Sequence, residues 1–179
     1  MHKINYARYI VLGMLSCGPT TGYEVKRFVK EFMSYIWDIS YGQIYPTLSL
    51  LERQGCATMN EEKTGGGRPK KVYQITDQGL TELQAWLRGP ETKEYELFLK
   101  LCFGSLLTPD ELIPKLEAYR RKREEELPIM EEWLKTMESG PVMGPNTPYY
   151  LLLTKFGFDY FHLEKEWCSQ SIETLKKLE

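Results

Sequence analysis

Between residues 56 and 76 the spacing of apolar side chains changes from that of helices to that of strands. The run CATMNEEKTGGGRPKKVYQIT contains two short strand-like segments, residues 57–61 and 71–75. A glycine-rich tip with a basic flank joins them, as expected of a β-hairpin. The remainder of the chain is predicted to be helical, so any fold proposed for it must place one hairpin among helices.

Helical patterns flank the hairpin, three before it and one after it. Residues 5–16 are apolar on almost all sides, as in a helix that is buried on several sides. A second pattern starts near Thr21, and its apolar stripe begins with Tyr23. Its cations are predicted on the solvent side: Lys26, Arg27 and Lys30. Thr76 is expected to cap a fourth helix, which ends at Gly89.

The third helical pattern begins with SYGQIYPTL, residues 40–48. Ser40 and Gln43 form an S-x-x-Q capping box, so Ser40 is the expected N-cap. At 100° per residue, the side chains that point to the core are Ile44, Leu48 and Leu51. The opposite face is formed by Gly42, Pro46, Ser49 and Arg53. Glycine and proline both disfavour a helix, so this is an unusual face for a helix that only packs within its own protein.

Three helices, a hairpin and a fourth helix in this order predict a winged helix-turn-helix. In this fold the third helix enters the major groove of DNA and the hairpin tip lies along the backbone. Gly42 allows close approach to a duplex, and Pro46 can contact a thymine methyl. Gln43 can read adenine through its amide, and Arg53 is expected at phosphate. The candidate DNA-binding residues are Ser40, Tyr41, Gly42, Gln43, Tyr45, Pro46, Ser49 and Arg53 on the helix, and Gly67, Arg68, Lys70 and Lys71 at the tip.

Alternatives stay open for these motifs. Gly42 and Pro46 could serve only to bend an ordinary packing helix, and the tip could be a solvated basic turn. The whole domain could also be a winged-helix module that docks proteins without binding specific DNA. Docking needs no positive tip, so reversing the charges of Arg68, Lys70 and Lys71 separates the two functions.

The second half of the chain is predicted to contain helices only. One spans residues 93–106, and Thr108-Pro109 opens the next, in which Pro114 and Pro128 are expected to cause kinks. The segment RRKREEE, residues 120–126, pairs charges four positions apart. We interpret it as a solvated helix face, with a second basic contact surface as the alternative.

Thr147-Pro148 is expected to cap a final helix that is rich in aromatic residues. Its apolar stripe is Tyr149, Leu152, Phe156, Tyr160, Leu163 and Trp167. This stripe is wider than a lone helix needs, so part of it should pack against a second subunit. It could also line a crevice beside the winged domain that binds a flat aromatic effector. The candidate effector-binding residues are Trp133, Tyr149, Phe156, Tyr160 and Trp167, with packing in the core and the dimer interface as the alternative.

The predicted fold is mostly α-helical with one small β-hairpin. Residues 1–90 are assigned to a winged helix-turn-helix DNA-binding domain, and residues 91–179 to an all-helical domain for dimerisation with a candidate effector site. The net charge of −2 hides an asymmetry, since residues 1–90 contain 11 Lys and Arg against 8 Asp and Glu, whereas residues 91–179 contain 12 against 17. The amino-terminal half can therefore face a polyanion.

No catalytic, metal or cofactor site is predicted, and an enzyme is not expected. The histidines are His2 and His162, and neither belongs to a Ser/His/Asp or Cys/His set. The four cysteines are far apart and are expected to be buried, reduced thiols. The uncharged stretch of residues 9–23 is too short for a membrane span, and no export signal is recognised, so a cytoplasmic protein without a membrane partner is expected.

Three segments carry a family resemblance: TGYEVKRF, GQIYPTLSLLERQG and GGGRPKKVYQITDQG. They resemble the PadR-type transcriptional regulators over about residues 5–89, and residues 91–179 match the longer members in outline. The resemblance implies that the third helix and the wing bind a two-fold operator and that a helical carboxy-terminal domain holds a homodimer together. It also implies that small aromatic compounds or drugs release the DNA. Repression is the family default.

Overall fold

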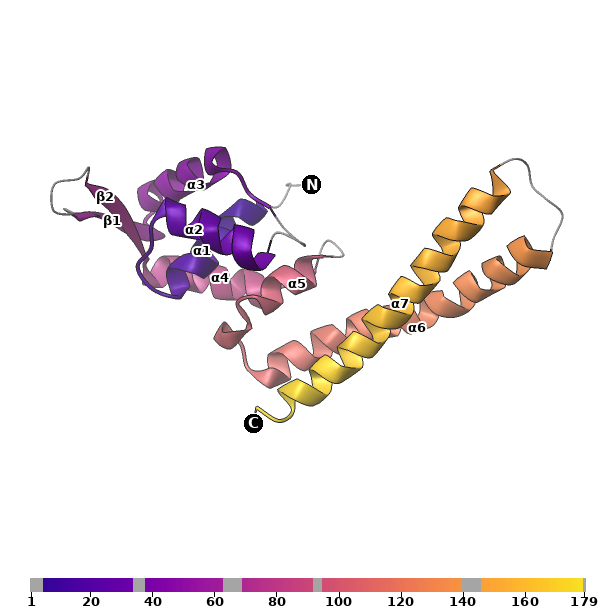
Figure 1. The fold of residues 1–179 in the computed structure, drawn as a ribbon. Helices are drawn as coiled ribbons and strands as arrows, with labels where there is room; N and C mark the ends of the chain where they lie inside the picture. Colours follow the sequence, from indigo (N-terminus) through magenta and orange to yellow (C-terminus); the bar gives the residue numbers. More distant parts are fainter. Residues whose placement is uncertain (1–4, 34–37, 63–68, 92–94, 140–145, 179) are drawn as a thin grey trace. The chain divides into compact units, whose positions relative to one another are not determined.

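A computed structural model describes residues 5–33, 38–62, 69–91, 95–139 and 146–178 (Figure 1). The chain divides into two compact units, Met1–Leu107 and Thr108–Glu179. The helices are α1 (Tyr6–Ser16), α2 (Gly22–Phe28), α3 (Tyr41–Arg53), α4 (Asp77–Arg88), α5 (Glu96–Leu101), α6 (Pro109–Ser139) and α7 (Thr147–Leu175), and the strands are β1 (Ala57–Glu62) and β2 (Lys70–Ile75). This order confirms the predicted fold class, a mostly helical chain with one antiparallel hairpin.

The first unit is built around α1. Ile10, Val11 and Leu12 of this helix are fully buried, as its apolar composition predicts. The inner faces of the neighbouring helices close the core with Val25, Ile44, Leu48, Leu51, Leu83 and Leu87. The hairpin pairs Ala57 with Ile75 at its base, and Thr20 adds a short bridge to Tyr73. This bridge ties the start of α2 to the hairpin.

Tyr23 is a correction to the predicted stripe of α2. Its side chain is 59% exposed, whereas Val25 and Val29 of the same stripe are buried. Residues 29–33 continue α2 as a π-helical turn. Lys26, predicted to be solvated, donates to the Ile39 carbonyl and to Asp38 at 2.7 and 2.6 Å. It therefore fixes the residues that lead into α3.

Residues 95–106 do not form the single predicted helix. α5 ends at Leu101, and a 3₁₀ turn follows at Gly104–Leu106. The ring of Phe103 packs over Gly13 of α1, where an added Cβ would lie only 2.3 Å from the ring. Packing of this buried ring against α1 explains why the chain leaves the helix at Phe103, so α5 and the turn belong to the first compact unit. The functional division between residues 90 and 91 stays a prediction.

The second unit is an antiparallel pair of long helices, α6 and α7 (Figure 1). The Thr108 amide donates to Glu111, as the predicted capping pattern requires. α6 continues through Pro114 and Pro128, and the kinks stay a prediction. The N-cap of α7 is Asn146 instead of Thr147. Among the described residues, no helix combines the length and the apolar character of a membrane span.

Arg123 contradicts the solvated interpretation of residues 120–126. Its side chain is fully buried, and its Nε donates to the Glu164 carboxylate of α7 at 2.5 Å. The guanidinium carbon also lies 4.8 Å from the ring centroid of Tyr119 and 4.2 Å from that of Phe161. The Tyr119 hydroxyl donates to Glu164 at 2.6 Å, and burial raises the pKa of this hydroxyl. One arginine of the charged run therefore fixes the register of the two helices.

The cysteines are all free thiols, but two of them are not buried as predicted. Cys56 and Cys168 are buried, whereas Cys17 and Cys102 are exposed. Both exposed thiols follow the last residue of a helix, α1 and α5 respectively, where the chain turns at the surface.

The buried ion pair between α6 and α7 generates a stability prediction. Arg123→Ala leaves the Glu164 carboxylate buried without its cation, so the free energy of unfolding should fall by about 3 to 5 kcal/mol. Lys122→Ala is the matched control, because Lys122 is 54% exposed and its pair with Glu126 at 3.7 Å should contribute at most about 1 kcal/mol. Urea unfolding followed by circular dichroism measures both, and equal losses would contradict the role of Arg123.

Candidate nucleic-acid interface

The start of α3 is held by the predicted capping box. Ser40 is the N-cap with an extended backbone, and its amide donates to Gln43 Oε1 at 2.9 Å. The Ser40 hydroxyl donates to the same oxygen at 3.2 Å. The Gln43 oxygen is thus already used within the protein, which the sequence interpretation of Gln43 as an adenine reader did not consider.

The outward face of α3 is the face predicted from the sequence. Ile44, Leu48 and Leu51 are fully buried, and Gly42, Gln43, Pro46, Ser49 and Arg53 are exposed. The rings of Tyr41 and Tyr45 are about half-exposed and stack with centroids 6.0 Å apart. Because Pro46 has no amide hydrogen, it cannot donate to the Gly42 carbonyl in the usual helical pattern. This weakens the helix at its exposed face.

Gly42 is not required by packing within the described protein. An added Cβ would meet only Ser40 Oγ, at 3.6 Å, which is an ordinary van der Waals distance. Alanine is the better helix former by about 1 kcal/mol. The choice of glycine here therefore has no internal reason, in contrast to Gly79, where a Cβ would lie 2.1 Å from the Cys56 carbonyl oxygen.

The wing is the β1–β2 hairpin, and its described cations are Lys70 and Lys71. Both are exposed, and they lie opposite Glu62 and Glu61 in the strand register. The sequence interpretation missed this pairing. Aligning the two predicted strands as an antiparallel hairpin would have placed the glutamates opposite the lysines. Gly67 and Arg68 of the predicted site lie outside the described residues.

A hollow of about 590 Å³ lies between the start of α2, Tyr45 of α3 and the start of β2, at the tip end of the wing. It is lined by Thr21, Gly22, Tyr23, Glu24, Arg27, Tyr45, Pro69, Lys70 and Lys71. Tyr23 and Arg27 were not among the predicted site residues: Tyr23 was assigned to the apolar stripe of α2, and Arg27 only to its solvent side. Hydrogen bonds from Thr21 lower the pKa of Glu24, so this carboxylate stays charged and caps α2. The hollow thus combines three cations with two tyrosines.

The candidate effector residues lie in the second unit and are spread along it. Trp133, Tyr149 and Phe156 are exposed, whereas Tyr160 and Trp167 are half-buried. Phe156 and Tyr160 stack with their centroids 6.0 Å apart. Since α7 is one continuous helix, Tyr149 and Trp167 are separated by about 27 Å along its axis. That span is much longer than a small aromatic molecule.

His162 is exposed and meets the ring of Phe158 edge-on at 4.6 Å. His2 lies outside the described residues. Within the part of the chain that the structure describes, no group of three His, Cys, Asp or Glu side chains could hold a metal ion.

The order of elements and the exposed face of α3 are those of winged-helix transcriptional regulators. Residues 11–85 match the model of the transcriptional regulator PadR-like family, and residues 95–176 match that of the virulence activator alpha C-terminal domain. The chain is 33% identical over 156 residues to the negative transcriptional regulator PadR of Bacillus subtilis, which is 83% of this chain and 86% of that protein. The chain belongs to the PadR-like family of transcriptional regulators, which are not enzymes. Membership favours DNA binding over protein docking.

Two solved structures of B. subtilis PadR are also similar to this chain. The complex with operator DNA is 28% identical, covers 96% of this chain and 99% of that one, and has a TM-score of 0.48. The complex with p-coumaric acid is 29% identical with the same coverage and a TM-score of 0.43.

Proposed function

We propose that this regulator represses transcription as a homodimer that binds a two-fold operator. In each copy α3 enters the major groove, and the wing lies along the phosphate backbone. The observation that carries the proposal is the outward face of α3, where Gly42 and Pro46 weaken the helix and no close contact with another described residue requires the glycine. The repressor assignment is supported by the relative from B. subtilis, which is a negative regulator.

Gln43 takes a narrower role in this proposal than a bidentate adenine contact. Its Oε1 accepts from the Ser40 amide, so reading adenine with both amide atoms would open the capping box. Its Nε2 can donate to guanine O6 or thymine O4 while the cap stays closed. Tyr41 and Ser49 then supply hydroxyl groups for phosphate or base edges, whereas the Ser40 hydroxyl already donates to Gln43 Oε1 in the cap.

The hollow beside α3 is suited to the DNA backbone. Arg27, Lys70 and Lys71 provide positive charge, and the Tyr23 and Tyr45 hydroxyls can donate to phosphate oxygens. Glu61 and Glu62 lie opposite the two lysines, so phosphate has to compete with these carboxylates. Arg53, together with Gly67 and Arg68 of the tip predicted from the sequence, completes the proposed contact set.

Gly42→Ala tests the proposal because it separates stability from DNA binding. The free energy of unfolding should stay constant or rise by up to about 1 kcal/mol, since the methyl meets only Ser40 Oγ, at an ordinary van der Waals distance. Affinity for DNA selected by the wild-type protein should fall about tenfold, because the methyl prevents close approach to the duplex. Fluorescence anisotropy and urea unfolding provide the two measurements.

The same substitution at Gly79 serves as the counterpart to Gly42→Ala. There the methyl collides with the Cys56 carbonyl, so Gly79→Ala should destabilise the protein by about 1 to 3 kcal/mol. For Gly42→Ala, an unchanged affinity for DNA would remove the main support for the proposal that α3 enters the major groove.

The exposed apolar face of α7 supports the proposed dimer. Tyr149, Leu152, Leu153, Phe156 and Leu163 are each 65 to 69% exposed. A soluble single chain rarely leaves so many large apolar side chains in water on one helix. We infer that a second copy covers them.

Phe156→Glu in the full chain should therefore produce a monomer at concentrations where the wild type is a dimer. A carboxylate buried in an apolar contact without a partner is strongly unfavourable. Glu173→Ala is the control, because Glu173 is an exposed, charged position near the other end of α7. Sedimentation velocity distinguishes the species, and a Phe156→Glu dimer of unchanged affinity would place the contact elsewhere.

The length of α7 limits which of the candidate effector-binding residues can contact one ligand. One small molecule cannot contact Tyr149 and Trp167 together, so we propose that an aromatic acid binds at the Phe156–Tyr160 stack. The methyl group of Met130 on α6 approaches Gly157 of α7, next to Phe156. Trp133 lies one helical turn from Met130, so it is our candidate for the tryptophan that reports ligand binding at this stack. Binding there would change the packing between copies, which links the ligand to DNA release.

p-Coumaric acid, the ligand in one crystal structure of B. subtilis PadR, is the first probe. Titration into the complex with selected DNA should give saturable quenching of tryptophan fluorescence together with loss of DNA. Trp133→Phe should remove most of the quenching and keep the release. Binding that leaves DNA affinity unchanged would rule out this acid as the effector.

A further inference from the structure

The turn at residues 54–56 joins the two elements that are proposed to touch DNA, α3 and β1. Gly55 has a φ of +72°, in the left-handed region that favours glycine, and it ends α3 sharply. The Cys56 amide donates back to the Leu51 carbonyl at 2.9 Å. The conformation of this turn therefore fixes the angle between the proposed recognition helix and the wing.

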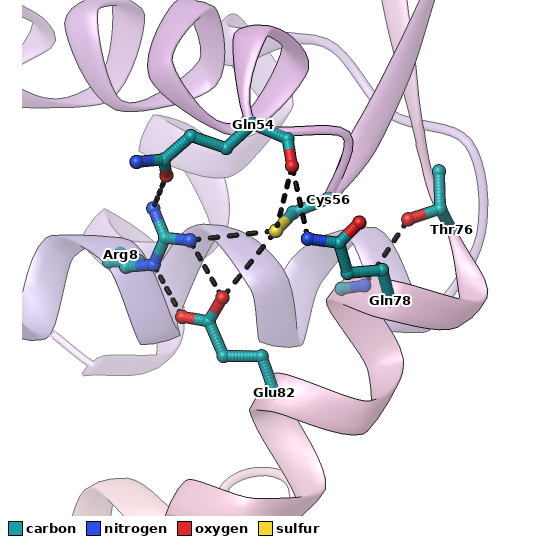
Figure 2. Close-up of polar contacts among 7 residues, drawn as sticks. Arg8, Gln54, Cys56, Thr76, Gln78 and Glu82 are labelled. Carbon is teal, nitrogen blue, oxygen red and sulfur yellow. Dashed lines mark hydrogen bonds and ion pairs between the residues drawn. The ribbon is translucent and has the colours of Figure 1, made fainter.

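The carbonyl groups of all three turn residues are bound by the start of α4. Gln78 Nε2 donates to the Gln54 carbonyl at 3.1 Å (Figure 2). The Thr76 hydroxyl donates to the Gly55 carbonyl at 2.6 Å. The Thr76 amide donates to the Cys56 carbonyl at 3.1 Å. These bonds hold the turn on one side.

Arg8 of α1 and Glu82 of α4 hold the turn on its other side (Figure 2). Arg8 Nε and Nη2 donate to the two Glu82 carboxylate oxygens at 2.5 and 2.7 Å. Arg8 Nη1 also donates to Gln54 Oε1 at 2.7 Å. Arg8 Nη2 and Glu82 Oε2 both lie 3.5 Å from the Cys56 sulfur. Arg8 thus contacts the first and the last residue of the turn.

The chemistry of this cluster favours a fixed arrangement. The Arg8 and Glu82 side chains are only 17% and 32% exposed, and two parallel bonds restrict their geometry. The hydrogen bonds from Arg8 lower the pKa of Glu82, so the pair is ionised at neutral pH. Burial raises the pKa of the Cys56 thiol. Neither Arg8 nor Glu82 belongs to the proposed DNA-contacting face.

We propose that Arg8 and Glu82 are positioning residues for DNA recognition, which set the angle between α3 and the wing through the turn at residues 54–56. This inference rests on the proposed function. A loose turn removes none of the DNA-contacting side chains. It lets α3 and the wing move relative to each other. Base reading requires both elements in one geometry, whereas non-specific binding to phosphate tolerates their motion.

The test compares Arg8→Met and Glu82→Gln with the wild type in the full chain. The first readout needs no DNA: the alkylation rate of Cys56 by iodoacetamide, followed by peptide mass spectrometry, with exposed Cys17 as the internal reference. Both variants should raise the Cys56 rate about tenfold relative to Cys17, because the turn opens. Lys30→Met is the matched control, since it removes one exposed cation from the same unit without contacting the turn.

The second readout is the ratio of affinities for wild-type-selected DNA and for random DNA. We expect the affinity for selected DNA to fall about tenfold in Arg8→Met and the affinity for random DNA to change less than twofold. Arg8→Lys should recover part of the ratio, because lysine keeps the charge but not the paired bonds. Variants are compared at a temperature where circular dichroism shows each to be folded.

The outcomes separate this inference from the proposed function. Unchanged Cys56 reactivity, or equal losses on both DNAs, would overturn the positioning role. If the wild type itself showed no preference for any DNA, the proposed function would fail, and the alkylation rates would still decide whether the pair holds the turn.

Discussion

Burial of one face of α3 against α1 is the constraint on which the first unit depends. Ile44, Leu48 and Leu51 are fully buried, as are Ile10 and Leu12 of α1, so the helix cannot rotate about its axis without exposing its inner face. The opposite face, with Gly42 and Pro46, is fixed toward solvent as a consequence. A weak helix face can persist there because the inner face and the bonds at both ends hold the helix. Lys26 fixes the residues before the N-cap of α3, and the Arg8–Glu82 pair contacts the turn that follows α3.

The features predicted correctly from the sequence have local causes. The capping residues Ser40 and Thr76 and the core face of α3 depend on residues within one or two turns of each other. The hairpin is also local, because its strands are joined by a short tip. These signals are sufficient for the fold class and for most of the described face of the candidate interface.

The features that the sequence did not reveal depend on partners far along the chain. Arg123 looks like a member of a solvated charged run until Glu164 of α7 is placed beside it. The Arg8–Glu82 pair and the contribution of Arg27 to the hollow likewise require the packing of separate helices. No periodicity within a single helix contains this information. Positioning residues are therefore harder to predict than contact residues, since they act through tertiary contacts.

Selection of bound DNA from a random pool, using the full chain, tests the central claim most directly. The account predicts enrichment of one sequence with inverted half-sites, whose centres are separated by one helical turn of DNA, about 10 base pairs, or a multiple of it. Each half-site should be occupied by one copy of the chain. A pool without enrichment, or an enriched asymmetric site that binds one copy, would contradict a dimeric regulator that reads DNA through α3.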